Sequence, residues 1–354
     1  MLKKLIIALI ILTFNILMLM FPQEVISAAK DGLLLWYNNV LPSLLPFMIG
    51  ANLLAGTGLI RRIGKLLHPI MMKIFGVPGA GSFALIAGLM SGYPVGAKIA
   101  TDLRQNGTLT KIEARRLIAF CNNAGPSLII GSVATTMLGA PQLGYFMLVI
   151  HIIAALSTGV LFKFILKDKP GTNVILQASN ASTNKSFVSL FGDSVTSAVT
   201  ILTQVGGFIV LFSVIARLID STGLMSALND VSRGFLIGTI EIVNGANILN
   251  ETALDTSHKA LLIGALAAWG GLSIHAQTIN IINKTDIGVS VYICGKALHM
   301  IFAIIYGLLA LKISEYITAP NWPVFSNSFA TNSNFGFTIV VVVPIAIFVC
   351  LKFK

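Results

Sequence analysis

The segment "LIGALAAWGGLSIHAQ", residues 262–277, places a glycine pair and three polar side chains inside a long apolar run. Polar groups in the hydrocarbon region of a bilayer are costly, and they commonly mark functional sites. Adjacent glycines favour a break in a helix, because glycine adopts backbone conformations that other residues avoid. We therefore predict a broken membrane helix whose polar side chains either cover the break or face a substrate. The five positions are Gly270, Gly271, Ser273, His275 and Gln277.

A second segment, "LIAFCNNAGPSLIIG" at residues 117–131, follows the same pattern. Proline lacks an N–H and disfavours helical backbone at the preceding residue. Pro126 therefore predicts a break that frees nearby carbonyl groups and starts a new half-helix at Ser127. Two interpretations stay open: a substrate site at the break, or a tolerated kink whose asparagines bridge neighbouring helices. The candidate site residues are Asn122, Asn123, Gly125, Pro126 and Ser127.

These two segments belong to a repeated order of elements. Leu117, Ile118 and Gly125 match Leu262, Ile263 and Gly270 at a constant offset of 145 residues. An interrupted apolar segment and a polar connector precede each of them. The interrupted segments are "GSFALIAGLMSGYPVGAKIA" at residues 81–100 and "GFLIGTIEIVNGANIL" at residues 234–249. Each of them fits either a full membrane span or a re-entrant hairpin.

The polar kinks of the interrupted segments are further candidate sites. As the tip of a hairpin, "GYPVG" brings backbone donors to a ligand, whereas the alternative is a tight turn without a ligand. Its candidate residues are Gly92, Tyr93, Pro94 and Gly96, and Asn244 is the corresponding residue of the second copy. Glu241 fits an H⁺ or Na⁺ coupling site, because a buried carboxylate becomes neutral unless it is paired. The alternative for Glu241 is an ion pair with Lys296, Arg217 or Arg233.

Histidines in apolar helices commonly make hydrogen bonds between helices, and this alternative stands beside a substrate role for His275. His151 and His299 lack a comparable polar setting, so we expect them to be packing residues.

The composition indicates a polytopic helical membrane protein. Of the 354 residues, 55% are hydrophobic and only 10% are charged, whereas a soluble domain carries about 25% charged residues. The net charge of +11 does not indicate nucleic-acid binding, because the basic residues are spread over many short loops. No metal-binding, nucleophile–base or phosphate-loop motif occurs, so we expect no metal, no cofactor and no enzymatic activity.

A spanning helix needs about 20 apolar residues, and we predict about eight such helices in addition to the two interrupted segments. The first is interpreted as an uncleaved helix, because its apolar run is long for a signal peptide. Residues 63–76 and 186–199 are typical of interfacial amphipathic helices. The predicted spans are Leu5–Phe21, Leu33–Ile60, Leu117–Leu138, Leu143–Leu166, Ile201–Ile219, Leu261–Ile282, Val289–Leu311 and Phe337–Leu351.

The distribution of basic residues favours re-entrant hairpins. With hairpins, 17 Lys and Arg residues fall on the cytoplasmic side and five fall outside, namely Lys30, Arg217, Arg233, Lys259 and Lys312. This asymmetry agrees with the excess of positive charge in cytoplasmic loops. Equivalent points of the two copies are then three crossings apart, so the second copy is inverted relative to the first.

Inverted repeats with broken helices are a transporter architecture. Backbone groups freed at a break must line a cavity or be covered by protein, and half-helix N-termini favour anionic ligands. We predict N-terminal helices in residues 1–60, a first repeat in 61–170, a linker with an amphipathic helix in 171–200, a second repeat in 201–312, and a loop with a last helix in 313–354.

The stretches "SGYPVGAKIATDL…EARRLIAFCNNAGPSLIIG" and "GGLSIHAQ…TDI" resemble a known family over roughly residues 33–311. It is the YlbJ or stage V sporulation protein V family of sporulation integral membrane proteins. These proteins carry the nucleoside-recognition gate domain that concentrative nucleoside carriers share.

The resemblance implies export of dipicolinic acid, a small aromatic dianion, from the mother cell across the outer forespore membrane. Tyr93 or Trp269 would then contact the aromatic ring. The alternatives are a nucleoside carrier and a spore-envelope assembly protein that transports nothing. The expected partners are the small anion and the lipid bilayer, and whether the chain forms a homo-oligomer stays open.

Overall fold

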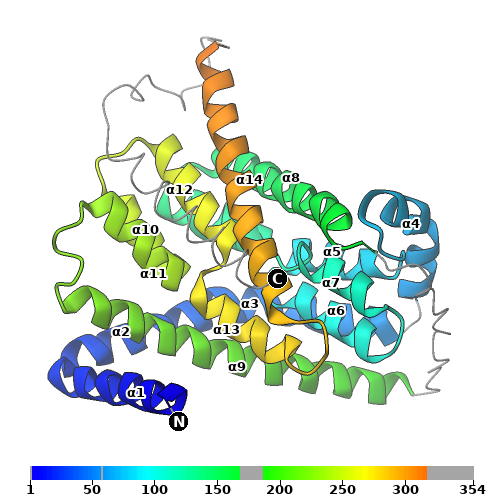
Figure 1. Ribbon diagram of the computed structural model, residues 1–354, viewed down its shortest axis with the longest axis horizontal. Coiled ribbons are helices and arrows are strands. Elements are labelled where there is room, and N and C mark those ends of the chain that lie inside the picture. Colours follow the sequence, from blue (N-terminus) through cyan, green and yellow to red (C-terminus); the bar gives the residue numbers. More distant parts are fainter. Residues whose placement is uncertain (1, 57–58, 168–185, 317–354) are drawn as a thin grey trace.

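The computed structural model describes residues 2–56, 59–167 and 186–316 as helices joined by short connections (Figure 1). No strand occurs in these three ranges. The predicted last helix, Phe337–Leu351, lies outside the described residues. The same holds for residues 168–185 of the linker and for residues 317–336 of the predicted outer loop.

Four helical segments of the described chain are long and apolar enough to cross a membrane. They are α8 (Pro141–Ile165), α9 (Phe187–Ser221), the pair α12 (Thr256–Trp269) and α13 (Gly271–Ile282), and residues 289–313 of α14 (Val289–Tyr316). A bent pair, α1 (Leu2–Met20) and α2 (Pro22–Leu35), makes a fifth if it counts as one span. The structure therefore supports four or five spans and does not confirm the expected eight.

Local backbone chemistry accounts for two of the differences. The predicted span Leu33–Ile60 divides into the end of α2, a π-turn η1 (Trp36–Val40) and α3 (Leu41–Gly56), which contains Pro46. The predicted span Leu117–Leu138 separates into two short helices at its Gly-Pro break. They are the end of α7 (Lys111–Ile118) and η2 (Ser127–Met137), which is wound as a π-helix. Counting apolar runs in the sequence therefore predicted more continuous membrane helices than the structure contains.

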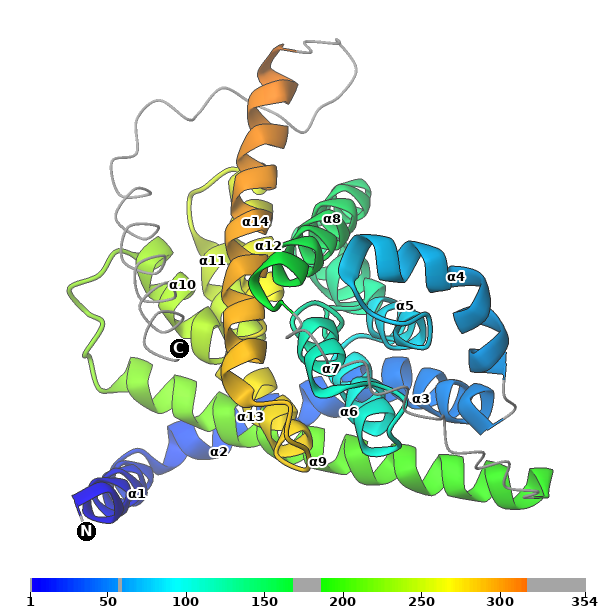
Figure 2. The ribbon, with the colours of Figure 1, turned by 45° about the vertical axis from the view of Figure 1, so that its right-hand side comes forward.

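The predicted interfacial helix at residues 186–199 is continuous with the span that follows it. Both belong to α9, so the expected boundary at residue 200 falls inside a single helix of 35 residues. Figures 1 and 2 show α9 along one side of the molecule, packed against α2 and α3. The indole N–H of Trp36 donates to the carbonyl of Leu202 over 2.9 Å and ties η1 to α9. Residues 63–76 form most of a separate helix, α4 (Leu59–Phe75).

Both interrupted segments fold as helical hairpins. The first consists of α5 (Gly81–Ser91) and α6 (Val95–Gln105), and the second of α10 (Asp230–Ile240) and α11 (Ile242–Glu251). A helix of 11 residues is about 16 Å long, which is half of the roughly 30 Å of a hydrocarbon core. No single arm is therefore long enough to span a membrane. Of the two alternatives for the interrupted segments, a full span or a hairpin, the structure supports the hairpin.

Each hairpin begins the same series of elements. In the first copy a capping box formed by Thr110 and Glu113 starts α7, which is followed by a break, η2 and the long α8. In the second copy Asp255 caps α12, which is followed by a break, α13 and the long α14. The two hairpins lie on either side of α13 and α14 in both views (Figures 1 and 2). The repeated order expected from the sequence is therefore present in the fold.

Polar contacts divide the loops into two groups that agree with the predicted sides of the membrane. Among loops expected in the cytoplasm, Arg116 donates to the carbonyls of Gly76 and Leu166. Arg104 forms a bidentate pair with Asp286, at 2.8 and 2.9 Å. Among residues expected outside, Arg217 pairs with Glu24 and Asp31, and Arg233 with Asp220 and Asp230. Positive charge on this second side is thus balanced by nearby carboxylates.

The Arg104–Asp286 pair joins the two repeats, and its loss should have a small, pH-dependent effect. Hydrogen bonds from Arg104 hold the pKa of Asp286 below its usual range. The pair therefore stabilises the fold at neutral pH, and this contribution is lost as the pH falls through the lowered pKa. Because the Asp286 side chain is 46% exposed, we expect Asp286→Asn to cost at most about 1 kcal/mol.

Thermal unfolding in detergent, at neutral and acidic pH, measures this difference. Arg104→Gln should cost a similar amount, and the double variant should cost little more than either single one. Additive losses in the double variant would contradict the pairing.

Candidate functional site

Both predicted helix breaks are present. In the first copy α7 ends at Ile118, residues 119–125 are not helical, and η2 starts at Ser127. In the second copy α12 ends at Trp269 and α13 begins at Gly271. Gly270 ends α12 with φ 98°, a left-handed conformation that favours glycine.

In each copy the tip of the hairpin packs directly on the break. A Cβ on Gly92 would lie 3.0 Å from the amide nitrogen of Gly125, and a Cβ on Gly125 would lie equally close to that of Gly92. In the second copy a Cβ on Gly271 would lie 3.1 Å from the carbonyl oxygen of Ile240. The glycines let backbone meet backbone, so each hairpin covers polar groups that its broken helix leaves free.

The two tips, the first break with the start of η2, and the first two turns of α13 together line a cavity of about 100 Å³. Four elements thus meet that are far apart in the sequence. The predicted site residues that line it are Gly92, Tyr93, Gly125, Ser127, Glu241, Ser273 and Gln277. Sequence reasoning missed Ser91 and Ser132, and it missed an apolar wall made of Leu35, Val40, Leu44, Val205 and Ile209. Nothing in the sequence pairs this wall, from α2, η1, α3 and α9, with the repeats.

The other predicted residues lie behind or beside the cavity. The amide of Asn122 donates to Thr278 Oγ1 over 3.0 Å and to the hydroxyl of Tyr292 over 3.4 Å. His275 Nδ1 lies 3.1 Å from the same hydroxyl. These contacts link the first break to α13 and α14, in agreement with the bridging alternative for both residues. Pro94, Gly96, Asn123, Pro126, Gly270 and Gly271 also do not line the cavity.

Glu241 is 5% exposed, and its carboxylate accepts a hydrogen bond from the backbone N–H of Asn244 over 2.8 Å. It thereby caps the N-terminus of α11 while lining the cavity. The ion pairs considered for it are not formed with Lys296, Arg217 or Arg233. Among the described residues Glu241 is therefore a buried carboxylate held by backbone donors.

A second, polar cavity of about 310 Å³ adjoins the first, and Leu35 and Val243 line both. Asn244 belongs to this second cavity, and its Nδ2 has no hydrogen-bond partner in the described part of the chain. Its other polar lining residues are Asp31, Asn38, Ser213 and Asn247.

The expected packing histidines belong to a buried polar network that sequence reasoning missed. His151 Nε2 accepts from the N–H of Ala124 over 3.1 Å, and the rings of His151 and His299 are 4.4 Å apart. His299 Nδ1 lies 3.3 Å from Lys296 Nζ. The signal for this network was present in α14, which carries Tyr292, Lys296 and His299 on otherwise apolar turns.

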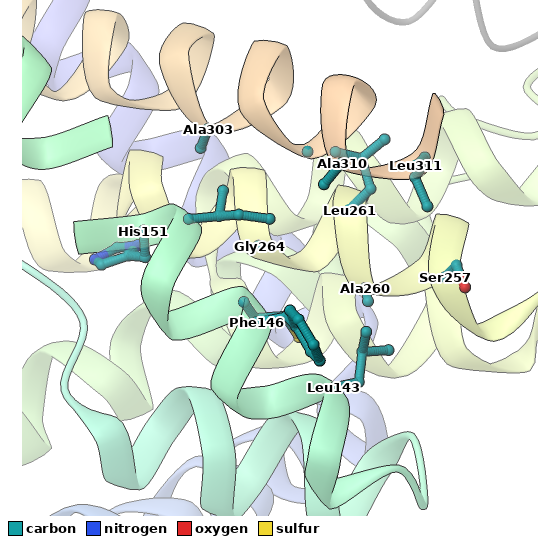
Figure 3. Close-up of a pocket in the computed structure, with 13 residues that line it drawn as sticks. Leu143, Phe146, His151, Ser257, Ala260, Leu261, Gly264, Ala303, Ala310 and Leu311 are labelled. Carbon is teal, nitrogen blue, oxygen red and sulfur yellow. The ribbon is translucent and has the colours of Figure 1, made fainter. Parts of the chain in front are cut away.

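A third hollow, of about 70 Å³, lies between α8, α12 and α14 (Figure 3). Its lining is apolar apart from His151 and Ser257, so it offers little to a polar ligand. In the described ranges no group of three His, Cys, Asp or Glu side chains is placed to hold a metal ion. The cavity between the tips is the strongest candidate site.

Comparison with known proteins places the chain in a family. The family model "Gate", described as nucleoside recognition, matches residues 38–141, from η1 to the start of α8. The chain is 33% identical over 320 residues to the sporulation integral membrane protein YlbJ of Bacillus subtilis (strain 168), an alignment that covers 82% of this chain and 78% of that protein. The chain belongs to the YlbJ family. No solved structure matches it. The gate region of this YlbJ-family chain contains the first hairpin, the first break and four of the seven polar residues that line the cavity, Ser91, Tyr93, Ser127 and Ser132.

The close contact between hairpin and break can be tested at Gly96. A Cβ there would lie 1.9 Å from the carbonyl oxygen of Cys121, so Gly96→Ala must push the hairpin away from the break. We expect a loss of about 3 kcal/mol or more, because the obstacle is backbone rather than a flexible side chain. Gly131→Ala is the matched control, since a Cβ there meets nothing within 4 Å. Thermal unfolding in detergent measures both variants, and equal stabilities would contradict the packing.

Proposed function

We propose that this YlbJ-family membrane protein is a carrier of a small organic anion rather than an enzyme, and that dipicolinate is its substrate. One observation carries the proposal: the two hairpin tips, the first helix break and the first two turns of α13 line one cavity. Irregular backbone at membrane depth is tolerated where it lines a cavity or is covered by protein. Transporters built from broken helices place their substrate at such a junction.

The pattern of contacts supports an inverted repeat. α7 packs on α14 while its counterpart α12 packs on α8, and α6 packs on α13 while its counterpart α11 packs on η2. Such reciprocal contacts are typical of two copies related by a two-fold axis. The equivalent long helices α8 and α14 run in opposite directions. Figure 3 shows this from Leu143 to His151 in α8 and from Ala303 to Leu311 in α14. Opposite directions in equivalent helices favour an axis in the membrane plane.

The lining of the cavity suits a flat molecule with polar groups at its edge. Leu35, Leu44 and Ile209 offer an apolar wall, and Ser127, Ser273 and Gln277 offer hydroxyl and amide donors. Of the two aromatic candidates for the ring, Tyr93 lines the cavity. Trp269 does not, and its indole N–H donates to the carbonyl of Thr239 over 3.2 Å.

The cavity is smaller than most ligand sites. A volume of about 100 Å³ compares with roughly 300 Å³ or more for sites of drug-sized ligands. We infer that the structure is a contracted state, and that loading requires side chains to move. The polar cavity of about 310 Å³ next to it lies on a route by which the substrate reaches the site.

Uptake by the purified protein in liposomes tests the proposal. Labelled dipicolinate should accumulate above the level of empty vesicles, and unlabelled dipicolinate should compete. The gate family's description as nucleoside recognition, together with the hydroxyl and amide lining, makes a nucleoside carrier the second candidate. Competition by uridine but not by dipicolinate would favour it. Uptake of neither compound would favour a spore-envelope assembly protein that transports nothing.

The proposed place of action is the outer forespore membrane. Spores that lack this protein should then contain much less dipicolinate than spores that have it, while dipicolinate made in the mother cell remains. Normal dipicolinate in those spores would contradict the proposed direction of transport.

Glu241 is the proposed coupling residue. Glu241→Gln keeps an oxygen that accepts the N–H of Asn244, so the cap of α11 survives while the titratable charge is lost. We expect the variant to lose the stimulation of uptake by an H⁺ or Na⁺ gradient. Glu251→Gln, at the exposed end of the same helix, is the matched control and should keep it. Unchanged stimulation in Glu241→Gln would contradict the assignment.

A further inference from the structure

We propose that Lys296 supplies the positive charge that recognises a carboxylate group of the carried anion, after the ring of Tyr93 that covers it has moved aside. This inference rests on the proposed carrier function and adds a residue that lies outside the cavity of the contracted state.

Lys296 is a buried amine without an acidic partner in the described part of the chain. Its side chain is 1% exposed, and its Nζ donates to the carbonyl oxygen of Asn122 over 3.0 Å. His299 Nδ1 is 3.3 Å away, and no Asp or Glu of the described residues forms an ion pair with it. An isolated buried charge costs several kcal/mol, roughly, unless an opposite charge compensates it. An anionic ligand is a natural partner for such a group.

The position of Lys296 is the junction of the two broken helices. The carbonyl oxygen of Asn122, which accepts a hydrogen bond from Lys296 Nζ, belongs to the first break. Its Cε lies 3.7 Å from where a Cβ on Gly270 would be, at the second break. Two polar atoms beside this junction, Asn122 Oδ1 and His275 Nε2, have no hydrogen-bond partner among the described residues although both side chains are at most 2% exposed. The junction thus holds a charge and unused hydrogen-bonding capacity.

Tyr93 contacts both Lys296 and the cavity. Its side chain lines the cavity, and its ring centroid is 5.3 Å from Lys296 Nζ, a cation–π contact. Its hydroxyl donates to the carbonyl of Ala267, in the last turn of α12 before the second break. Rotation of this one side chain would enlarge the contracted cavity and would uncover the ammonium group.

The charge of the cavity supports the same assignment. Glu241 is the charged residue that lines it. A dicarboxylate gains no attraction from a carboxyl group, and hydroxyl and amide donors alone do not balance two negative charges. Lys296 adds the missing positive charge from behind Tyr93, and an ammonium–carboxylate contact in a dehydrated site is stronger than a neutral hydrogen bond.

The test compares two ligands of the same shape and different charge. Binding of dipicolinate and of its neutral diamide, pyridine-2,6-dicarboxamide, is measured on the purified full-length protein by competition with labelled dipicolinate. Wild-type protein should prefer the dianion. Lys296→Gln should weaken dipicolinate binding by at least about tenfold while diamide binding changes by less than about threefold, since tenfold corresponds to 1.4 kcal/mol.

Lys98→Gln is the matched control. Lys98 lies on α6 and pairs with Asp102, so its charge is already compensated. This variant should keep the wild-type ratio of the two affinities.

Three results would overturn the inference. Equal weakening of both ligands in Lys296→Gln would mean that the residue only holds the fold together. A wild-type protein that binds the diamide as well as dipicolinate would exclude charge recognition, and this result does not depend on whether a variant folds. Failure of wild-type protein to bind either compound would instead refute the proposed function, and the role of Lys296 in it.

Discussion

The structure depends on one constraint: backbone N–H and C=O groups inside a membrane must find partners within the protein. This chain breaks two helices in the middle of apolar segments and therefore leaves such groups free. A helical hairpin meets each break, and glycine lets the backbones approach closely: Gly92 meets Gly125 in the first copy, and Gly271 meets the carbonyl of Ile240 in the second. None of the four hairpin arms, α5, α6, α10 and α11, is long enough to cross a membrane. The positions of the hairpins in the fold therefore depend on their contacts with the breaks.

The polar side chains around the breaks serve two distinct purposes. One set, which includes Asn122, His275 and Tyr292, makes hydrogen bonds between the first break and α13 and α14. Another set, which includes Ser127, Ser273 and Gln277, faces the cavity. The separation is physical, because a group that satisfies its neighbours in the interior has little capacity left for a ligand.

The charges follow the same division between support and function. Partly exposed arginines, such as Arg217 and Arg233, pair with carboxylates that are partly exposed as well. Glu241 and Lys296 are buried, and among the described residues neither has an ion-pair partner. Buried charges that the protein leaves unpaired in a contracted state are well placed to respond to an ion or an anionic substrate.

The sequence by itself determined the class of protein, the two helix breaks, the repeated order of elements and the polar tips. Each of these follows from local chemistry: hydropathy, the missing N–H of Pro126, and the conformational freedom of Gly270. Only the tertiary structure decided which apolar runs are continuous, since the first pair of helices is bent by 101° and residues 187–199 continue without interruption into the span of α9. It also decided that Asn122 and His275 lie behind the cavity, that α2, α3 and α9 supply its apolar wall, and that Lys296 lies behind Tyr93. These facts depend on contacts between residues as far apart in the sequence as Tyr93 and Lys296, and no local pattern encodes which of two polar groups finds a partner.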